Sequence, residues 1–368
     1  MAQEQIGQFG INHVSILDKE GNVDEKLASG FTKEQLSEMY YYMNLLRKFD
    51  EKLFNLQRSG KIGTYAQTKG QEASEIGSGL ALSENDWFVP SFRELGVYLT
   101  RKVPKNLLVQ AWNGDTRALG NPNHSHNLPI SIPIGSQCIH ATGIAWASQI
   151  KQEKDVTIVY FGEGATSEGD FHEAMNFAGV FNLPIVFFCQ RNGWSISTPT
   201  TKETKSETIA QKAIAYGFKG IQVDGNDVLA VNKVTTQAIE KARSGDGPTL
   251  IESITYRMGD HTTSDDSMKY RTQEEINEWE NKDPVLRFEK YITNNNILNE
   301  QEKTDIHNAI EREIQEAVEQ GLSVEKPNPE QMFEDVFAQM PEMLKEQKEE
   351  LLNEIIQMSE QNNNGGNQ

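Results

Sequence analysis

Two short apolar runs on either side of an amphipathic segment constrain the fold of this chain more than any other feature. Residues 156–161 and 184–189 are β-branched, aromatic and almost wholly apolar, as expected of strands that are covered on both faces. Between them, five apolar residues recur at helical spacing: Phe171, Ala174, Met175, Ala178 and Phe181. The pattern therefore predicts a β-α-β unit with two parallel strands, and with it an α/β fold.

Polar residues follow both predicted strands directly. Glu163 stands between Gly162 and Gly164 after the first strand, and Asn192 follows the second. Ligand crevices in open parallel sheets form outside the carboxyl ends of the strands. Glycines beside an acid let backbone amides approach an anion. One carboxylate, one amide oxygen and a backbone carbonyl suit Mg²⁺, which leaves room for phosphate. The unit therefore predicts a site for a metal-bridged diphosphate.

Two common nucleotide-binding motifs are missing from the sequence. The third glycine of the dinucleotide fingerprint G-x-G-x-x-G is replaced by Ser167, and no G-x-x-x-x-G-K-[ST] loop is present. A Gly-x-Gly pair after a strand is common in proteins without a cofactor. The pair at 162–164 therefore carries weight only together with Asn192.

Charge and composition exclude several classes of protein. A net charge of −19 argues against nucleic acid as a partner, because its phosphates attract basic surfaces. No run of about 18 apolar residues occurs, so we expect no membrane span, and the first residues do not resemble a secretory signal. Cys138 and Cys189 form no CxxC pair and lie in apolar contexts, which predicts buried thiols in a reducing compartment. We therefore expect a cytoplasmic protein.

The pattern divides the chain into three parts. Residues 1–30 are expected to form an irregular arm with a short strand at 14–17, and residues 31–340 an α/β domain that is mainly helical from about residue 273. Residues 341–368 should form a charged helix, to about residue 358, and a disordered tail. Capping patterns at Thr32 and Thr272 open two helices of the domain. Its other expected elements are helices at 71–82, 207–216 and 228–243 and strands at 89–92, 221–223 and 249–254.

The words G-E-G and N-G-W, about thirty residues apart, resemble the fingerprint of enzymes that use thiamine diphosphate. Four longer words are more specific: GEGATSEGDFHEAMNFAGVFNLP, VDGNDV, GPTLIESITYRMGDHTTSDDSMKYR and NPEQMFEDVFAQMP. From about residue 30 to 345 the chain is similar to alpha subunits of the decarboxylating first component of 2-oxo acid dehydrogenase complexes, of pyruvate or branched-chain type. The resemblance implies a thiamine-diphosphate-binding α/β fold with a mainly parallel sheet between helices, an N-terminal arm and a helical C-terminal extension.

The resemblance also implies roles for particular residues. Glu163, Asn192 and the carbonyl oxygen of Trp194 would bind Mg²⁺. Arg93, Arg257 and His261 would contact the cofactor diphosphate, and His261 would also be the catalytic histidine that handles protons and charge. The other cofactor-binding residues would be Phe92, Ile132, Ile134, Gly162, Gly164 and Ala165, with Ile134 holding the cofactor bent. Branched-chain members further imply a potassium site at Ser131, Pro133, Ser136 and Gln137.

Several positions depart from the family pattern. Phe92 replaces a usual Tyr and loses one phosphate hydrogen bond, worth on the order of 1 kcal/mol. Arg191 stands where the family usually has the first of two asparagines, and Trp194 replaces a common Tyr. Glu163 matches branched-chain members, whereas residues 120–129 resemble pyruvate-type sequences. The long polar loop 257–271 would close over the cofactor, and it is phosphorylated in animal members. Whether it is phosphorylated here is open.

The implied reaction is oxidative decarboxylation of a 2-oxo acid on thiamine diphosphate, with acyl transfer to a lipoyl domain. We expect pyruvate as the substrate and an α₂β₂ assembly with a beta subunit, bound to a dihydrolipoyl acyltransferase core. The alternatives are a branched-chain 2-oxo acid dehydrogenase subunit, an acetoin dehydrogenase subunit and a non-catalytic assembly paralogue. The acidic surface has three interpretations: solubility, docking of basic segments of the acyltransferase, and adaptation to salt.

Overall fold

The computed structural model describes residues 7–28, 30–120, 125–334 and 336–365. Its contacts divide the chain into two compact units, Met1–Leu322 and Ser323–Gln368. The division lies ahead of residue 340, where the sequence pattern placed the end of the main domain. Residues 1–6 of the predicted arm, 121–124 of the pyruvate-like segment and 366–368 of the predicted tail lie outside the described residues.

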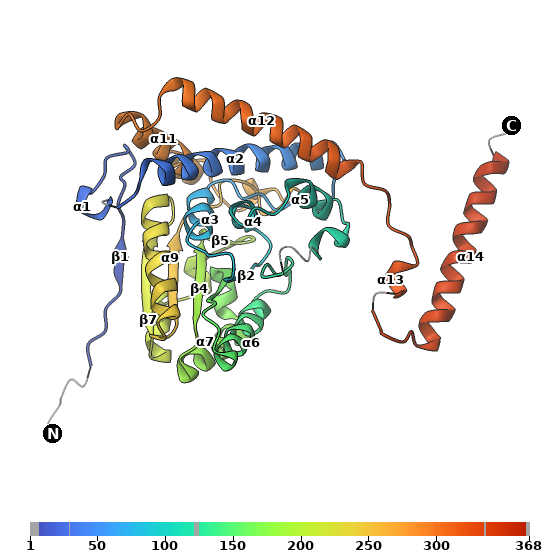
Figure 1. Ribbon diagram of the computed structural model, residues 1–368, viewed down its shortest axis with the longest axis horizontal. Coiled ribbons are helices and arrows are strands. Elements are labelled where there is room, and N and C mark those ends of the chain that lie inside the picture. The colour runs from blue at the N-terminus through green and yellow to red at the C-terminus, as the bar shows by residue number, and fades with distance from the viewer. Residues whose placement is uncertain (1–6, 29, 121–124, 335, 366–368) are drawn as a thin grey trace. The chain divides into compact units, whose positions relative to one another are not determined.

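A six-stranded parallel sheet is the central element of the first unit (Figure 1). Its strands are β1 (Asn12–Val14), β2 (Trp87–Val89), β3 (Thr157–Gly162), β4 (Ile185–Arg191), β7 (Lys219–Asp224) and β8 (Thr249–Ile254). They lie in the order β1-β7-β8-β4-β3-β2, and every neighbouring pair is parallel. Helix α7 (Gly169–Phe181) connects β3 to β4, so the predicted β-α-β unit and the α/β class are confirmed.

Helices cover both faces of the sheet, and each face has its own apolar core. On one face lie α3 (Glu72–Gly79) and α9 (Val228–Arg243), and on the other lie α6 (Ser136–Lys151) and α7. Side chains alternate along β3, so that Ile158 and Tyr160 join the first core and Val159 and Phe161 join the second. This double coverage explains why the central strands are continuous apolar runs.

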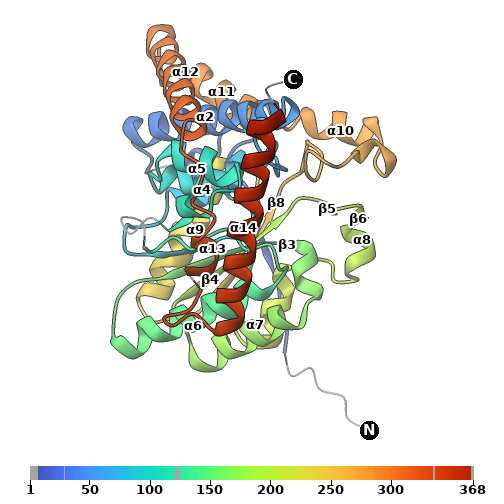
Figure 2. The same cartoon turned by 90° about the vertical axis from the view of Figure 1, so that its right-hand side faces the viewer.

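Helix α2 (Lys33–Arg58) begins with the capping box that the sequence predicted. The Thr32 hydroxyl accepts a bond from the Gln35 backbone N–H at 3.3 Å, and the Gln35 side chain accepts one from the Thr32 N–H at 3.0 Å. Helix α12 (Glu300–Leu322) packs along α2 and α5 (Lys105–Trp112) (Figures 1 and 2). The C-terminal third of the main unit is therefore helical, as expected.

The remaining elements are short. The first unit also contains helices α1 (Glu25–Ala28), α4 (Leu95–Thr100), α8 (Thr200–Glu203), α10 (Gln273–Glu280) and α11 (Pro284–Asn294). Its 3-10 turns are η1 (Thr116–Leu119), η3 (Glu163–Ser167), η4 (Ala210–Tyr216) and η5 (Ser267–Lys269). A small antiparallel pair, β5 (Trp194–Ser195) and β6 (Thr198–Pro199), follows β4 (Figure 2). The second unit contains α13 (Gln331–Glu334) and α14 (Glu342–Gly365). No helix within the described ranges is long and apolar enough to cross a bilayer.

Four sequence-based boundaries differ from the structure. The arm strand lies at Asn12–Val14 instead of 14–17, because the side chain of Asp227 accepts the backbone N–H groups of Ile16 and Leu17. The strand expected at 89–92 is β2, which ends at Val89 because Pro90 cannot donate to the sheet. Residues 210–216 form a 3-10 turn, not the predicted α-helix. Helix α14 continues to Gly365, so the first part of the predicted tail, 361–365, is helical.

Asp227 is a fully buried acid that joins the arm to α9. One carboxylate oxygen accepts the backbone N–H groups of Ile16 and Leu17, each at 2.6 Å. The other accepts those of Leu229 and Ala230 at 3.1 Å and so caps the helix. All four donors are buried in the chain interior, where an unpaired N–H is costly.

We expect Asp227→Asn to lower the free energy of unfolding by about 3 kcal/mol. Whichever way the new amide turns, its NH₂ group faces one pair of donors that has lost its acceptor. Urea unfolding followed by circular dichroism measures the change. Asp246→Asn, at an exposed aspartate, is the control and should change stability by less than about 0.5 kcal/mol. Equal stability of the two variants would contradict this role of Asp227.

Candidate active site

Three segments meet at the carboxyl ends of β3, β4 and β8, and hydrogen bonds beyond the strands hold them together. The N–H of Thr255 donates to the Arg191 carbonyl at 2.9 Å, and that of Arg257 donates to the Asn192 carbonyl at 3.2 Å. On the other edge of the same segment, the Met258 N–H donates to the Lys69 carbonyl at 3.0 Å. The residues after β4, those after β8 and the turn before α3 therefore lie side by side.

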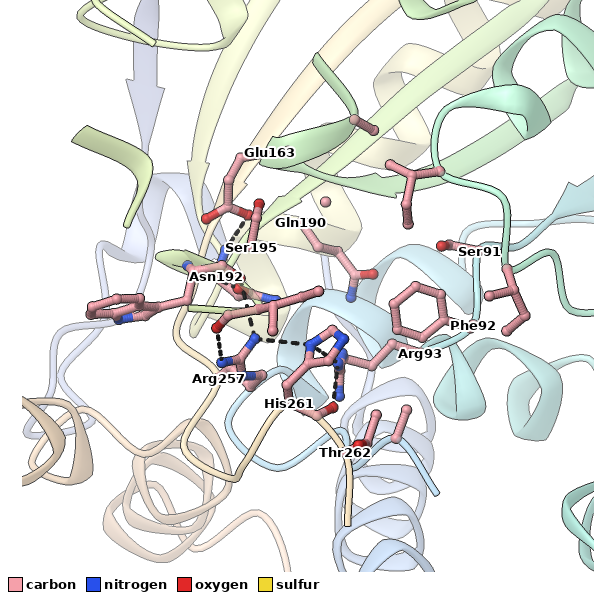
Figure 3. A pocket seen from close by; sticks show the side chains of 18 of the residues that line it. Ser91, Phe92, Arg93, Glu163, Gln190, Asn192, Ser195, Arg257, His261 and Thr262 are labelled. Atoms are coloured by element: carbon pink, nitrogen blue, oxygen red, sulfur yellow. Dashed lines mark hydrogen bonds between the residues drawn. The ribbon is translucent and has the colours of Figure 1, made fainter. Parts of the chain in front are cut away.

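A cavity of about 680 Å³ opens where these segments meet (Figure 3). All twelve residues that the sequence predicted to bind a cofactor line it: Phe92, Arg93, Ile132, Ile134, Gly162, Glu163, Gly164, Ala165, Asn192, Trp194, Arg257 and His261. They come from five separate stretches of sequence. The structure thus brings together what the sequence spreads over about 170 residues, although their roles remain predictions.

Glu163 is a buried carboxylate whose hydrogen bonds in the described structure come from neutral donors. It is 1% exposed and lies at the start of η3, directly after β3. Oε2 accepts the backbone N–H of Asn192 at 3.1 Å, and Oε1 accepts the hydroxyl of Thr200 at 2.9 Å. Burial raises the pKa of the Glu163 carboxyl above its usual value. A cation beside it would remove the cost of burying the negative charge.

Asn192 and Trp194 line the same cavity as Glu163 and carry two further oxygens. Gly193 between them has a φ of +91°, a left-handed conformation that glycine adopts without strain. The side-chain oxygen of Asn192 accepts the Trp194 N–H at 3.2 Å, and the Trp194 carbonyl accepts Arg257 Nη1 at 3.2 Å. Within the described residues no three His, Cys, Asp or Glu side chains form a metal-binding group. A carboxylate, an amide and a carbonyl oxygen are instead a donor set that suits Mg²⁺.

Arg93 and Arg257 form a positively charged group in the cavity, with His261 between them (Figure 3). Arg93 Nη2 donates to His261 Nδ1 at 3.3 Å and to the His261 carbonyl at 2.8 Å, and Arg257 Nη1 donates to the same Nδ1 at 3.2 Å. Because a guanidinium can only donate, Nδ1 is an acceptor and the imidazole proton is on Nε2. Two buried guanidinium groups this close favour an anion such as a diphosphate.

The same two arginines set the charge of the histidine. Burial, then Arg93 and Arg257, lower the pKa of His261 to about 4, so the imidazole is neutral at neutral pH. Burial and the nearby Arg257 also lower the pKa of Arg93 to about 10. An anion between the guanidinium groups would reverse both effects, because its negative charge favours the protonated forms.

The sequence model of the protein family described as "Dehydrogenase E1 component" matches residues 40–330 of the chain. The chain is 42% identical over 339 residues to the pyruvate dehydrogenase E1 component subunit alpha of Acholeplasma laidlawii, covering 90% of this chain and 97% of that one. It is 41% identical over 326 residues, 88% of each chain, to the 3-methyl-2-oxobutanoate dehydrogenase subunit alpha of Mycobacterium tuberculosis. The identity with the Staphylococcus aureus pyruvate dehydrogenase E1 component subunit alpha is 40% over 338 residues, 91% of each chain.

The chain belongs to the dehydrogenase E1 component family. It is an alpha subunit of the 2-oxo acid dehydrogenase type, and the predicted resemblance is confirmed. Membership of this family implies thiamine diphosphate as the cofactor. It also implies a beta subunit and a larger 2-oxo acid dehydrogenase complex.

Arg191, which departs from the usual E1 pattern, has a partner in the sheet. Its Nη1 lies 2.8 Å from an oxygen of Glu252, a fully buried residue on β8. The other Glu252 oxygen accepts the Ala210 N–H at 3.0 Å and the Gln222 amide at 3.2 Å. In this E1 chain the substitution thus neutralises a buried carboxylate, and it leaves Asn192 in the cavity.

The structure also shows the surroundings of Phe92 and of the four residues predicted to bind potassium. The Phe92 ring lies 5.9 Å from the His261 ring and provides no hydroxyl for a phosphate. Of the four residues predicted for potassium, Gln137 lines the cavity and its Oε1 has no partner among the described residues. The Ser136 hydroxyl donates to the Pro133 carbonyl at 3.0 Å, and the Ser131 N–H donates to the Ser91 carbonyl at 2.7 Å.

Sequence reasoning missed several polar residues of this E1 site, and three of them contact or adjoin the predicted ligands. Gln190 lies two positions before Asn192 on β4, so strand alternation could have placed both on the cavity face. Gln71 precedes α3 and lines the cavity, although no periodic signal marks it. Thr200, which donates to Glu163, follows a turn whose course the sequence does not specify.

The loop 257–271 is held by Arg271 and Asp265. The Arg271 guanidinium donates to the carbonyl oxygens of Arg257, Met258 and Gly259. Asp265 accepts the His261 N–H at 2.9 Å. These bonds fix His261 at the edge of the cavity, so the loop is an ordered part of the site.

We expect the His261 imidazole of the ligand-free chain to stay neutral down to about pH 4, because burial and two arginines depress its pKa. An unfolded chain protonates near pH 6.5, so folding stability should fall as pH drops from about 6.5 towards 4. Histidine-selective NMR titration measures the pKa, and His261→Gln assigns the signal. Inorganic pyrophosphate should raise the titration midpoint. A midpoint near 6.5 without ligand would contradict the arrangement.

Proposed function

We propose that this chain is the alpha subunit of a pyruvate-type 2-oxo acid dehydrogenase that binds thiamine diphosphate and Mg²⁺. The observation that carries the proposal is that a single cavity contains both a buried negative group and buried positive groups. Among the described residues, the buried carboxylate of Glu163 forms no ion pair, and neither do the Arg93 and Arg257 guanidinium groups beside His261. A magnesium diphosphate neutralises both kinds of group at once.

The residues present have distinct tasks in this proposal. Glu163, Asn192 and the Trp194 carbonyl hold Mg²⁺, while Arg93 and Arg257 hold the diphosphate. His261 is neutral and carries its proton on Nε2, so this nitrogen donates to an oxygen in the cavity. Thiamine diphosphate, when bound, supplies the electron sink for decarboxylation. The chain supplies binding, orientation and charge, and these depend on the buried contacts already described.

The choice of pyruvate depends on residues 120–129, because identity does not separate the substrates. Relatives named for pyruvate and for 3-methyl-2-oxobutanoate are equally similar, at 42% and 41%. A branched-chain 2-oxo acid is therefore the second candidate, and Glu163, the residue that branched-chain members carry, favours it. Acetoin is a third candidate that uses the same cofactor.

A substrate panel on the complex with its beta subunit tests the proposal. Dye reduction is followed with pyruvate, 3-methyl-2-oxobutanoate, 4-methyl-2-oxopentanoate and acetoin, in the presence of thiamine diphosphate and Mg²⁺. We expect the highest kcat/KM for pyruvate and no turnover by the alpha chain alone. Preference for a branched acid would replace pyruvate by the second candidate. No turnover with any substrate would favour the non-catalytic paralogue.

The proposed α₂β₂ assembly is supported by an open side of the cavity. Ile132 and Ile134, which are predicted to contact the cofactor, are 64% and 48% exposed in this chain. A cofactor against them would face solvent unless a second chain covers it. Decarboxylation sites exclude water, so the beta subunit is the natural cover. Transfer of the acyl group to a lipoyl domain of the acyltransferase core then completes the reaction.

An apolar patch on α6 and α7 indicates where the beta subunit binds. It comprises large apolar residues that are between 38% and 69% exposed: Ile139, Trp146, Ile150, Val180 and Phe181. The rings of Trp146 and Phe181 lie 5.5 Å apart, so the two helices form one surface. An exposed patch of this kind is typical of a protein interface.

Gly143 adds a second argument for a helix at this patch. It lies on α6 between Ile139 and Trp146 at the spacing of a packed helical seam, and no described atom outside the nearby backbone of α6 and the two adjacent residues lies within 4 Å of the position that a Cβ would take. A glycine inside a helix costs about 1 kcal/mol relative to alanine. Its benefit is that the backbone of a second helix can approach closely.

We expect Gly143→Leu to abolish co-purification of the beta subunit without destabilising the alpha chain. Leucine fills the seam, yet it raises helix propensity by about 0.8 kcal/mol, so the thermal midpoint of the isolated chain should not fall. Trp146→Glu should have the same effect on assembly. The control is Leu286→Glu on α11, where an equally exposed apolar side chain lies outside the patch. Assembly that survives both patch variants would refute this interface.

A further inference from the structure

Gln71 is a fully buried side chain that connects the turn before α3 to the proposed metal site. Its Oε1 accepts a hydrogen bond from Asn192 Nδ2 at 3.1 Å. Its Nε2 is equally buried and has no partner among the described residues. Gln71 also lines the cavity. The oxygen of the Gln71 amide therefore contacts a predicted metal ligand, and its nitrogen donor has no partner among the described residues.

Together with the Trp194 N–H, this contact sets which atom of Asn192 is available to a cation. An asparagine amide presents either oxygen or nitrogen, and a hard cation binds only the oxygen. In the structure, Asn192 Oδ1 accepts the Trp194 N–H at 3.2 Å, while Nδ2 is turned towards Gln71. Without the Gln71 oxygen, Nδ2 would lose that partner, and the Trp194 N–H would be the one contact of the two that still holds the amide oxygen in its present place.

The backbone around Gln71 holds this acceptor firmly in place. Gly70 has a φ of +97°, and a Cβ there would lie 2.2 Å from the Tyr256 carbonyl oxygen, so the turn packs directly on the segment after β8. Glu72, which follows Gln71, forms a 2.5 Å ion pair with Arg47 and accepts the Gly70 N–H at 2.9 Å. Gln71 thus acts from a rigid turn, as a side chain that orients a metal ligand must.

We propose that Gln71 is a positioning residue for Mg²⁺ binding, which fixes the amide of Asn192 so that its oxygen faces the metal. This inference rests on the proposed function, because it requires Mg²⁺ at Glu163, Asn192 and Trp194. Gln71 acts through Asn192 and is not itself a metal ligand.

Mg²⁺ titration of the metal-stripped αβ complex at saturating thiamine diphosphate tests this role. Binding is followed by tryptophan fluorescence, since Trp112 and Trp194 line the cavity. Gln71→Met keeps the size of the side chain but removes the acceptor, and should raise the Kd for Mg²⁺ about 10- to 100-fold. Gln71→Glu keeps an acceptor oxygen, and its Kd should stay within about threefold of the wild type.

Two further variants separate orientation from general damage. Gln110→Met changes another buried glutamine, which bonds to Asp115 at 2.7 Å outside the cavity, and should leave the Kd unchanged. Asn192→Asp presents oxygen whichever way it turns, so Gln71→Met should weaken Mg²⁺ binding much less in that background. The double variant therefore tests the proposal even if Gln71→Met lowers stability.

Each outcome has a defined meaning. A wild-type complex that binds neither Mg²⁺ nor cofactor would refute the proposed function itself. If the wild type binds and Gln71→Met binds equally well, the positioning role is wrong. The role is also wrong if Gln71→Glu loses as much affinity as Gln71→Met, or if the Asn192→Asp background gives no rescue. A loss in Gln71→Met that both oxygen-bearing variants reverse supports it.

Discussion

The parallel pairing of β3 with β4 is the constraint from which the site follows. Its register ends with Gly162 beside Gln190, so the residues directly after the two strands are neighbours. Glu163 and Asn192 therefore meet through a 3.1 Å hydrogen bond, although 28 residues separate them in the sequence. A shift of the pairing by one residue would turn the side chains of one strand to the opposite face. The apolar cores on the two faces prevent that shift.

The cavity contains buried groups of both charges, which a ligand with a cation and an anion would neutralise. One wall holds a buried carboxylate, and the other holds two guanidinium groups that share one histidine nitrogen. Within the described residues neither group forms an ion pair, although acids such as Asp265 and Glu94 lie near enough to act on the arginines. Burial of these charges therefore destabilises the ligand-free fold, and binding of a ligand with the opposite charges offsets that cost. Such sites are typical of functional positions in enzymes.

Sequence reasoning predicted the central part of this molecule well. The two apolar runs, the helix between them and the cap at Thr32 were recognisable because each depends on local periodicity or on a short-range hydrogen bond. Contacts such as those of Gln71 with Asn192 and Arg191 with Glu252 were not predictable. Each joins residues far apart in sequence, and each depends on a register that only the folded sheet provides. The shift of the arm strand has the same cause, since Asp227 competes for the backbone from over 200 residues away.

The ion pair of Arg191 and Glu252 has a consequence for how this chain can change over time. Glu252 is fully buried, and it also accepts bonds from Ala210 and Gln222. Loss of Arg191 alone would leave a buried carboxylate without its cation, and loss of Glu252 alone would leave a cation beside the sheet. An asparagine at position 191 is therefore compatible with this sheet only if position 252 changes as well. We therefore expect positions 191 and 252 to covary among proteins related to this chain.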